Sequence, residues 1–255
     1  MMNIVLITGA SSGMGREFAR QIDKIYTNGI DEIWLVARRK ARLEELAGEL
    51  EHKTRIFPMD LTDEKAMADL ELNLNLINPN IKLLVNASGF GIMGKFTDVY
   101  AKEHADVIRL NCEALTNVTH IALSYMRRGA RIVQFASSAA FLPQPGFAVY
   151  AASKSYVLSF SRALNNELKE REISVTAVCP GPVNTEFFDI AEKNGTNYHF
   201  KKAFMASEDK VVRKALCDAY HRKDVSVYSL SMNLFRFAAK IVPHKFIMFL
   251  LKFLK

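Results

Sequence analysis

The stretch "NIVLITGASSGMG", residues 3–15, decides the fold of this chain. Its first six residues form a short apolar run rich in Val and Ile, which predicts a buried β-strand. Glycines at positions 9, 13 and 15 allow a sharp turn, and a helical pattern follows from Gly13 to about Tyr26. A helix that starts in such a turn offers free N–H groups and the positive end of its dipole to a phosphate. The stretch therefore predicts a phosphate-binding strand–turn–helix unit.

Short apolar segments and helical segments alternate along the rest of the chain. Strands are predicted at 32–37, 54–60, 81–87, 130–136 and 173–179, and helices at 39–51, 63–77, 98–126 and 149–171. Strands separated by helices form βαβ units, so we predict an α/β fold with one doubly wound parallel sheet, Rossmann-type, covered by helices on both faces. The alternation lapses at 184–206, beyond the end of a strand, where α/β proteins usually carry a binding loop.

Composition excludes several classes of protein. Of the 255 residues, 49% are hydrophobic, which is ample for a core. The net charge of +7 comes from basic residues spread along the chain, so we predict no nucleic-acid partner. Cys112, Cys179 and Cys217 show no pairing pattern and the six histidines no ligand spacing, so neither a disulfide framework nor a metal site is expected. A reducing cytoplasm is the predicted location, and the first apolar run indicates a strand rather than a signal peptide.

The end of the second predicted strand indicates which dinucleotide would fit. NAD-binding proteins usually place an acidic residue there for the ribose 2′-hydroxyl. This chain has "VARRK", residues 36–40, with the neutral Ala37 followed by Arg38. A guanidinium suits a 2′-phosphate, so we predict NADP(H) as the cofactor, with Arg38 as its ligand. The alternative is an ordinary basic start to a helix.

A tyrosine and a lysine stand one helical turn apart in "VYAASKS", residues 149–155. Positions i and i+4 share one face of a helix, so Tyr150 and Lys154 can act as one unit. A nearby ammonium, together with a cationic nicotinamide in the oxidised state, favours the phenolate, so both are expected to lower the pKa of Tyr150 toward the range useful for proton transfer. The alternative is a surface tyrosine stacked on a lysine stem.

With these motifs in this order, the chain resembles the short-chain dehydrogenase/reductase family from about Asn3 to Tyr228. The matching segments are "TGASSGMG", "MDLTD", "VNASGFG", "RLNCEAL", "FASSAA", "VYAASKS" and "PGPVNT". The resemblance implies a catalytic set of Asn111, Ser137, Tyr150 and Lys154. The cofactor-binding residues that it implies are Gly9, Ser11, Ser12, Gly13, Met14, Gly15, Arg38, Asp60, Leu61, Asn86, Ala87, Ser88, Tyr150, Lys154, Pro180, Gly181, Val183 and Thr185.

The resemblance also implies a reaction and a role for each catalytic residue. The chain would be an NADP(H)-dependent oxidoreductase that interconverts a carbonyl and a secondary alcohol, with Tyr150 as general acid and base. Ser137 would bind the substrate oxygen, although Ser138 remains an alternative. Lys154 would hold the nicotinamide ribose, and Asn111 would position a water molecule unless it is only a helix-interior amide satisfied by backbone.

Two segments depart from the family pattern or lie outside it. Ala87 and Ser88 replace the usual Asn-Ala, which puts one sheet-stabilising hydrogen bond in doubt. The aromatic residues between Phe187 and Met205 predict an apolar substrate, such as a steroid, a 3-oxoacyl chain or an aromatic ketone. Equally, they could anchor the loop to the body of the protein.

The predicted domain organisation separates the tail from the rest of the chain. Residues 1–229, including the loop 184–206, would form the dinucleotide-binding catalytic domain, and residues 230–255 a basic amphipathic extension. We expect the extension to pack as a lid or at the interface of a homodimer or homotetramer, with contact to a membrane surface as the alternative. Two other functions stay open, a non-catalytic NADP-binding sensor and a membrane-associated scaffold.

Overall fold

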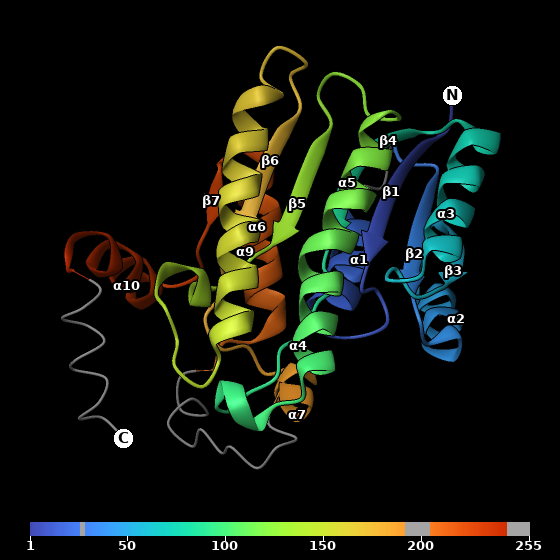
Figure 1. Cartoon of the computed structure of the whole chain (residues 1–255). Helices are drawn as coiled ribbons and strands as arrows, with labels where there is room; N and C mark the ends of the chain where they lie inside the picture. The colour runs from blue at the N-terminus through green and yellow to red at the C-terminus, as the bar shows by residue number, and fades with distance from the viewer. Residues whose placement is uncertain (26–28, 192–204, 244–255) are drawn as a thin grey trace.

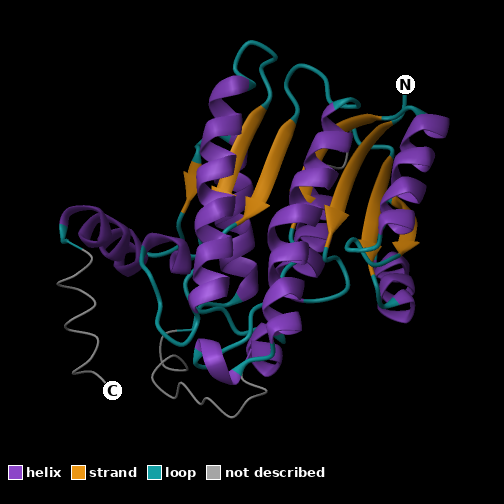
Figure 2. Ribbon diagram, viewed as in Figure 1, coloured by secondary structure: helices purple, strands orange, loops and turns teal. Residues whose placement is uncertain are grey.

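A computed structural model describes residues 1–25, 29–191 and 205–243 of the chain. Within these ranges, seven strands form one parallel sheet in the order β3-β2-β1-β4-β5-β6-β7 (Figures 1 and 2). The strands are β1 (Asn3–Thr8), β2 (Glu32–Ala37), β3 (Lys53–Pro58), β4 (Asn80–Asn86), β5 (Arg131–Phe135), β6 (Ser174–Val178) and β7 (Val225–Ser226). The order reverses between β1 and β4, which confirms the predicted doubly wound sheet.

Helices cover both faces of this sheet (Figure 1). They are α1 (Gly13–Ile25), α2 (Lys40–Glu49), α3 (Glu64–Ile77), α4 (Ala101–Ile108), α5 (Leu115–Leu123), α6 (Ala148–Glu167), α7 (Phe187–Ala191), α9 (Glu208–Tyr220) and α10 (Leu230–Ile241). Short 3-10 helices lie at η1 (Phe96–Asp98) and η3 (Ser138–Phe141), and η2 (Arg109–Ala114) is a π-helical segment. No helix in these described ranges combines the length and the apolar character needed to cross a bilayer.

The core consists of two apolar layers, one on each face of the sheet. Side chains alternate along β1, so Ile4 and Leu6 pack with α3, α5 and α6 on one face. Val5 and Ile7 pack with α1, α2 and α9 on the other. Because both faces are buried, the central strands are continuous apolar runs, the pattern that identifies them in the sequence.

Three features differ from the sequence prediction. The helical region predicted at 98–126 is divided, because the π-helical segment η2 interrupts the α-helical pattern between α4 and α5. Helix α9 and strand β7 were not predicted; β7 has only two residues, too few to show a strand periodicity. In the predicted loop 184–206, residues 187–191 form α7, and Val183 pairs with Ala206 in an isolated bridge. Tyr198, Phe200 and Phe204 lie outside the described residues.

The beginning of the C-terminal extension is a helix, α10, that lies beside η3. Phe235 contacts Phe141 of η3, with ring centroids 6.3 Å apart. The other side of α10 exposes four large apolar side chains, those of Leu230, Leu234, Phe237 and Ile241. The second helical pattern predicted beyond Pro243 lies outside the described residues.

Candidate functional site

A cleft runs along the carboxyl ends of the parallel strands, the edge at which open α/β sheets bind ligands. One part of the cleft extends from the glycine turn after β1 across the ends of β2 and β3. An adjoining part contains the ends of β5 and β6 and the first turns of α6. The two parts are continuous, because both are lined by Met14, Ala87, Gly89, Phe135, Thr185 and Phe187.

The glycine turn has backbone conformations and packing that side chains would prevent. Gly9 and Gly13 have φ angles of +69° and +54°, in the left-handed region that favours glycine. A Cβ atom on Gly15 would lie 2.3 Å from the carbonyl oxygen of Gly9, and one on Gly9 would lie 2.7 Å from the backbone of Ala87. The turn is therefore held tightly against β4, with the N-terminus of α1 facing the cleft. This arrangement suits a phosphate group.

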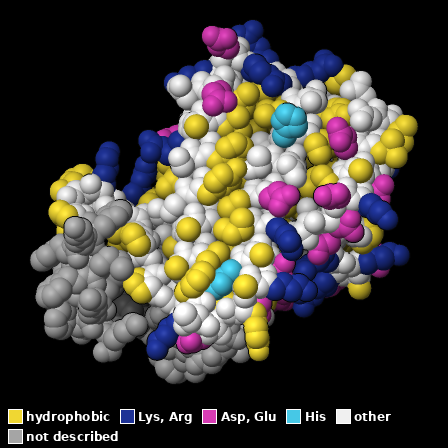
Figure 3. Space-filling view, in the orientation of Figure 1, with side chains coloured by type: hydrophobic (Ala, Val, Ile, Leu, Met, Phe, Trp, Pro, Cys, Tyr) yellow, Lys and Arg dark blue, Asp and Glu magenta, His cyan; other side chains and the backbone are white. Residues whose placement is uncertain are grey.

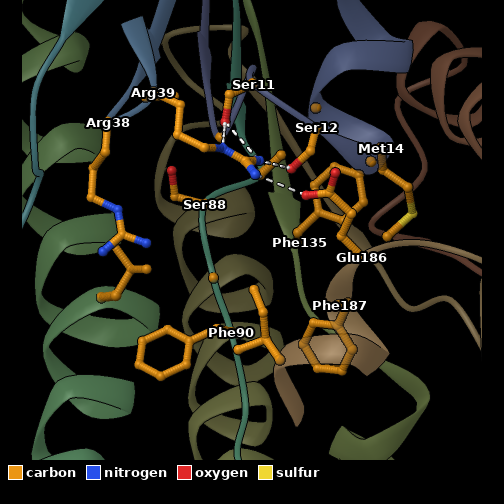
Figure 4. Close-up of a pocket in the computed structure, with 18 of the residues that line it drawn as sticks. Ser11, Ser12, Met14, Arg38, Arg39, Ser88, Phe90, Phe135, Glu186 and Phe187 are labelled. Atoms are coloured by element: carbon orange, nitrogen blue, oxygen red, sulfur yellow. Dashed lines mark hydrogen bonds and ion pairs between the residues drawn. The ribbon is translucent and has the colours of Figure 1, made fainter. Parts of the chain in front are cut away.

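The arginine that contacts this turn is Arg39, the residue after the predicted phosphate ligand Arg38. Arg39 donates hydrogen bonds from Nη2 to Ser12 Oγ (2.6 Å) and Ser11 Oγ (3.2 Å) (Figure 4). The side chain of Arg38 is 71% exposed, and its Nη1 lies 3.7 Å from Asp60 Oδ2. Both arginines line the cleft, but only Arg39 contacts the serines of the turn. The sequence did not indicate which of the two arginines would reach the turn, because the direction of each side chain depends on the conformation of the chain between β2 and α2.

The predicted cofactor-binding residues at the ends of β3 and β4 divide into two groups. Asp60, Leu61, Ala87 and Ser88 line the cleft. Burial acts to raise the pKa of Asp60, but hydrogen bonds from Thr62 and the neighbouring Arg38 together hold this pKa below its ordinary value. Asn86 is different, because its buried side chain reaches Thr119 of α5 and does not line the cleft. It joins the larger network described next.

Asn86 links β4 to its neighbours through buried hydrogen bonds. Its Nδ2 donates to Thr119 Oγ1 (2.9 Å) and to Gln134 Oε1 (3.0 Å), and Gln134 Nε2 also donates to Thr119 Oγ1 (2.9 Å). The network therefore connects β4, β5 and α5. It supports the sheet edge of the cleft although Ala87 and Ser88 replace the usual residues, and Ser88 N still donates to Thr8 Oγ1 (3.3 Å).

The tyrosine–lysine pair lies in the second part of the cleft, on α6. Lys154 Nζ is 5.7 Å from the centroid of the Tyr150 ring, and both side chains are buried. Lys154 Nζ donates to the carbonyl oxygen of Phe135 at 2.7 Å, which fixes the ammonium at the end of β5. The surface-stacking alternative therefore does not describe this pair.

Burial shifts both pKa values in the direction that favours the uncharged side chain. It raises the pKa of Tyr150 to about 12, although a hydrogen bond with Ser137 acts to lower it. It lowers the pKa of Lys154 to about 8. Loss of hydration is the largest influence on both pKa values, and the expected lowering of the Tyr150 pKa by Lys154 together with an oxidised nicotinamide stays a prediction.

Ser137 and Ser138 both line this part of the cleft. Ser137 acts to lower the pKa of Tyr150, and its Oγ accepts from Ala139 N at 3.1 Å. Ser138 N donates to the carbonyl oxygen of Pro180 at 2.8 Å, which ties the start of η3 to the segment after β6. Ser137 is thus the serine in contact with the phenol.

Asn111 is fully buried in the π-helical segment η2. Its Oδ1 accepts from Phe90 N (3.0 Å), and its Nδ2 donates to Phe90 O (2.9 Å) and Ser153 Oγ (3.0 Å). A Cβ atom on Gly89 would lie 2.9 Å from Asn111 Oδ1 and 3.2 Å from Lys154 Nζ, so this glycine admits both groups. The amide holds the segment after β4 against α6, beside the lysine.

Aromatic side chains form the wall around Tyr150. Phe147 stacks on its ring with centroids 4.2 Å apart, and Phe187 of α7 lies 5.3 Å away. Phe188 contacts Phe187 at right angles, with centroids 5.6 Å apart. A Cβ atom on Gly91 would lie 2.6 Å from the Tyr150 ring, so the wall is closely packed.

The segment after β6 completes the cleft. Pro180, Gly181, Val183 and Thr185, which the sequence predicts to bind the cofactor, line the part that contains Tyr150. A Cβ atom on Gly181 would lie 2.8 Å from Met232 Sδ, so α10 packs directly behind this segment. Glu186 Oε2 accepts a hydrogen bond from Arg39 Nη1 at 2.9 Å, which joins this segment to the glycine turn. Neither residue was among the predicted site residues.

Comparison with known proteins gives consistent results. The family model described as short chain dehydrogenase matches residues 3–195. The chain is 37% identical over 193 residues to sulfoacetaldehyde reductase 2 of Chromohalobacter salexigens, covering 73% of this chain and 75% of that one. It is 33% identical over 244 residues to serine 3-dehydrogenase of Agrobacterium fabrum, covering 91% and 94%.

A solved structure resembles the whole arrangement. It is a short-chain dehydrogenase from Sphingobium yanoikuyae in complex with NADPH, 30% identical, with a TM-score of 0.76 over 90% of this chain and 89% of that one. The family model, the relatives and the sheet topology agree with one another. The chain therefore belongs to the short-chain dehydrogenase family and is an oxidoreductase that acts on the CH–OH/C=O pair.

Proposed function

We propose that this protein is an NADP(H)-dependent reductase of an apolar carbonyl compound, catalysing the reverse oxidation of the secondary alcohol as well. The observation that carries the proposal is the contact of Tyr150 with Ser137 and Lys154 in a cleft that continues to the glycine turn. Carbonyl reduction with a dinucleotide requires a general acid held beside the substrate oxygen and a site that binds the phosphates of the dinucleotide.

The residues of the cleft fit a nicotinamide dinucleotide. The turn at Gly9 and Gly15 leaves no room for side chains, and a helix N-terminus faces the cleft beside it. The guanidinium groups of Arg38 and Arg39 offer donors for a 2′-phosphate at the end of β2. The NADPH complex of the Sphingobium yanoikuyae relative supports the same preference.

When bound, the dinucleotide supplies the hydride to the substrate carbon in reduction and accepts it in oxidation. In reduction, Tyr150 donates its phenolic proton to the carbonyl oxygen as negative charge develops there. A pKa of about 12 keeps this phenol protonated at neutral pH, so the group is ready to act as an acid. In the reverse direction the phenolate accepts the proton of the alcohol.

The other three residues hold this acid and the substrate in place. The Ser137 hydroxyl hydrogen-bonds the substrate oxygen beside Tyr150. Lys154, fixed by the carbonyl of Phe135, holds the nicotinamide ribose and places positive charge next to the phenol. Asn111 positions the lysine by holding the segment that carries Gly89.

The aromatic wall supports an apolar substrate. Phe147, Phe187 and Phe188 surround the phenol. A polar substrate would lose its hydration against these rings and would gain no hydrogen bonds from them. We therefore assign the substrate to ketosteroids, 3-oxoacyl compounds or aromatic ketones.

Assembly as a homodimer or homotetramer is part of the proposal. Apolar side chains form a band along the face drawn in Figure 3, over α4, α5 and α6. The exposed large side chains of these helices and of the segment before them are Phe96, Tyr100, Ile108 and Tyr156. Such a band supports a contact between subunits.

The test is oxidation of NADPH, with NADH in parallel, against a ketosteroid, a 3-oxoacyl thioester, an aromatic ketone and a small polar aldehyde. Tyr150→Phe should reduce kcat at least ~100-fold and leave the Kd for NADPH unchanged, because general acid catalysis contributes on that order. Tyr156→Phe, an exposed tyrosine on the same helix, is the matched control. Tight binding without turnover would instead favour the sensor, and full turnover in Tyr150→Phe would refute the assigned acid.

A further inference from the structure

Glu186 connects two parts of the chain that are far apart in sequence. It lies between Thr185 and the start of α7, yet its carboxylate contacts residues at the end of β2 and in α2. Oε2 accepts a hydrogen bond from Arg39 Nη1 at 2.9 Å, and Oε1 accepts one from Arg42 Nη1. Figure 4 shows the Glu186 carboxylate beside the Arg39 guanidinium, which also reaches Ser11 and Ser12.

The Glu186 carboxylate therefore accepts hydrogen bonds from a guanidinium group that faces the cleft. Glu186 and Arg39 line it together with Ser11 and Ser12. Hydrogen bonds from Arg42 and Arg39 hold the pKa of Glu186 below its ordinary value, so this carboxylate is anionic at neutral pH. Its charge opposes any anionic group that approaches Arg39 from the cleft.

The ion pairs of Glu186 are of a kind that a ligand can displace. The side chains of Arg39, Arg42 and Glu186 are 43%, 39% and 42% exposed. Ion pairs at this exposure are weak, because water and salt screen the charges. A phosphate group with two negative charges and three acceptor oxygens is a stronger partner for a guanidinium than one carboxylate.

We propose that Glu186 is a specificity-determining residue that competes with the 2′-phosphate of the dinucleotide for Arg39. The inference rests on the proposed NADP(H)-dependent function. Glu186 weakens the binding of NADPH and leaves that of NADH nearly unchanged, because NADH carries no group at this position. Glu186 thereby reduces the preference for NADPH over NADH that Arg38 and Arg39 provide.

The test is isothermal titration of the full-length protein with NADPH and NADH, without substrate. Glu186→Gln keeps the size of the side chain and removes its charge. We expect its Kd for NADPH to fall on the order of tenfold at low salt, with less than about a twofold change for NADH. The gain should shrink at high salt. Adenosine 2′,5′-bisphosphate against AMP should show the same difference, which locates the effect at the 2′-phosphate.

Two variants serve as controls. Glu186→Asp keeps the charge and should retain most of the wild-type difference between the two dinucleotides. Glu45→Gln removes the same charge from a residue that pairs with Arg16 at 2.9 Å and does not line the described cleft, so both Kd values should stay as in the wild type.

The inference is overturned if Glu186→Gln weakens NADPH binding, because the carboxylate would then position the arginines. An equal gain for NADH also overturns it, because the charge would then act on the shared pyrophosphate. If Glu186→Gln has no effect while Arg39→Ala removes the NADPH preference, the inference fails and the proposed function stands. A wild-type protein that binds NADPH but reduces no carbonyl compound contradicts the proposed function instead.

Discussion

Lys154 is a buried amine whose protonation should control the stability of the fold. Its side chain is 4% exposed, and burial lowers its pKa from 10.5 to about 8. In the unfolded chain the amine still binds its proton up to about pH 10.5. Between these values the unfolded state holds more protons, so the free energy of unfolding rises with pH. One pKa unit corresponds to about 1.4 kcal/mol, which gives a total effect of about 3 kcal/mol.

The perturbation is Lys154→Met, which keeps a long side chain and removes the ionisable group. Below pH 8 the variant escapes the cost of the buried charge, offset by about 1 kcal/mol for the hydrogen bond to the Phe135 carbonyl. From pH 8 to pH 10 the wild type should gain about 2 kcal/mol of unfolding free energy relative to the variant. Tyr150 does not interfere in this window, because its raised pKa reduces stability only above pH 10.

The assay is urea unfolding at pH 7, 8, 9 and 10, followed by the fluorescence of Trp34. This is the only tryptophan of the chain and is fully buried. Lys65→Met, at an exposed lysine of α3, is the control and should run parallel to the wild type. Parallel pH curves for wild type and Lys154→Met would refute the reasoning, because the amine would then be as well solvated in the fold as outside it.

Two further predictions concern the cofactor end of the cleft. Arg39→Ala should raise the Kd for NADPH at least about tenfold and leave NADH unchanged, with a smaller effect for Arg38→Ala, because Arg39 alone contacts the serines of the turn. Titration of both variants with both dinucleotides checks this order, and equal effects would contradict it. Gly15→Ala should lose dinucleotide binding and lower Tm, because its Cβ would lie 2.3 Å from Gly9 O; unchanged binding and melting would show that the turn can open.

The fold was largely predictable because its strands are buried on both faces. Runs such as Ile33–Val36 are apolar without interruption, which is the pattern of central parallel strands. Helix α9 also escaped prediction although its buried Val211, Val212, Ala215, Leu216 and Ala219 have helical spacing, so the sequence did carry a signal for it. Two other features lack such a signal. Strand β7 has two residues, and the π-helical segment around Asn111 pairs residues i and i+5 instead of i and i+4, which apolar spacing does not reveal.

The candidate site was predictable where a motif fixes geometry within a few residues. Tyr150 and Lys154 share a helix, and Gly9 and Gly15 share a turn, so sequence spacing becomes spatial proximity. Contacts between distant segments are different. Glu186 meets Arg39 across 147 positions, and that pairing depends on how the segment after β6 folds back over the cleft.

The pKa of Tyr150 shows why spacing alone does not give the chemistry. One turn of helix places Lys154 near the phenol and suggests a lowered pKa, but the same fold buries both groups. Because burial removes hydration from both groups, the pKa of Tyr150 rises to about 12 and that of Lys154 falls to about 8. At neutral pH both groups therefore hold their protons, which favours Tyr150 as a proton donor. In the proposed mechanism the protonated phenol is the acid for carbonyl reduction, and oxidation would need further positive charge beside the phenol to stabilise its anion.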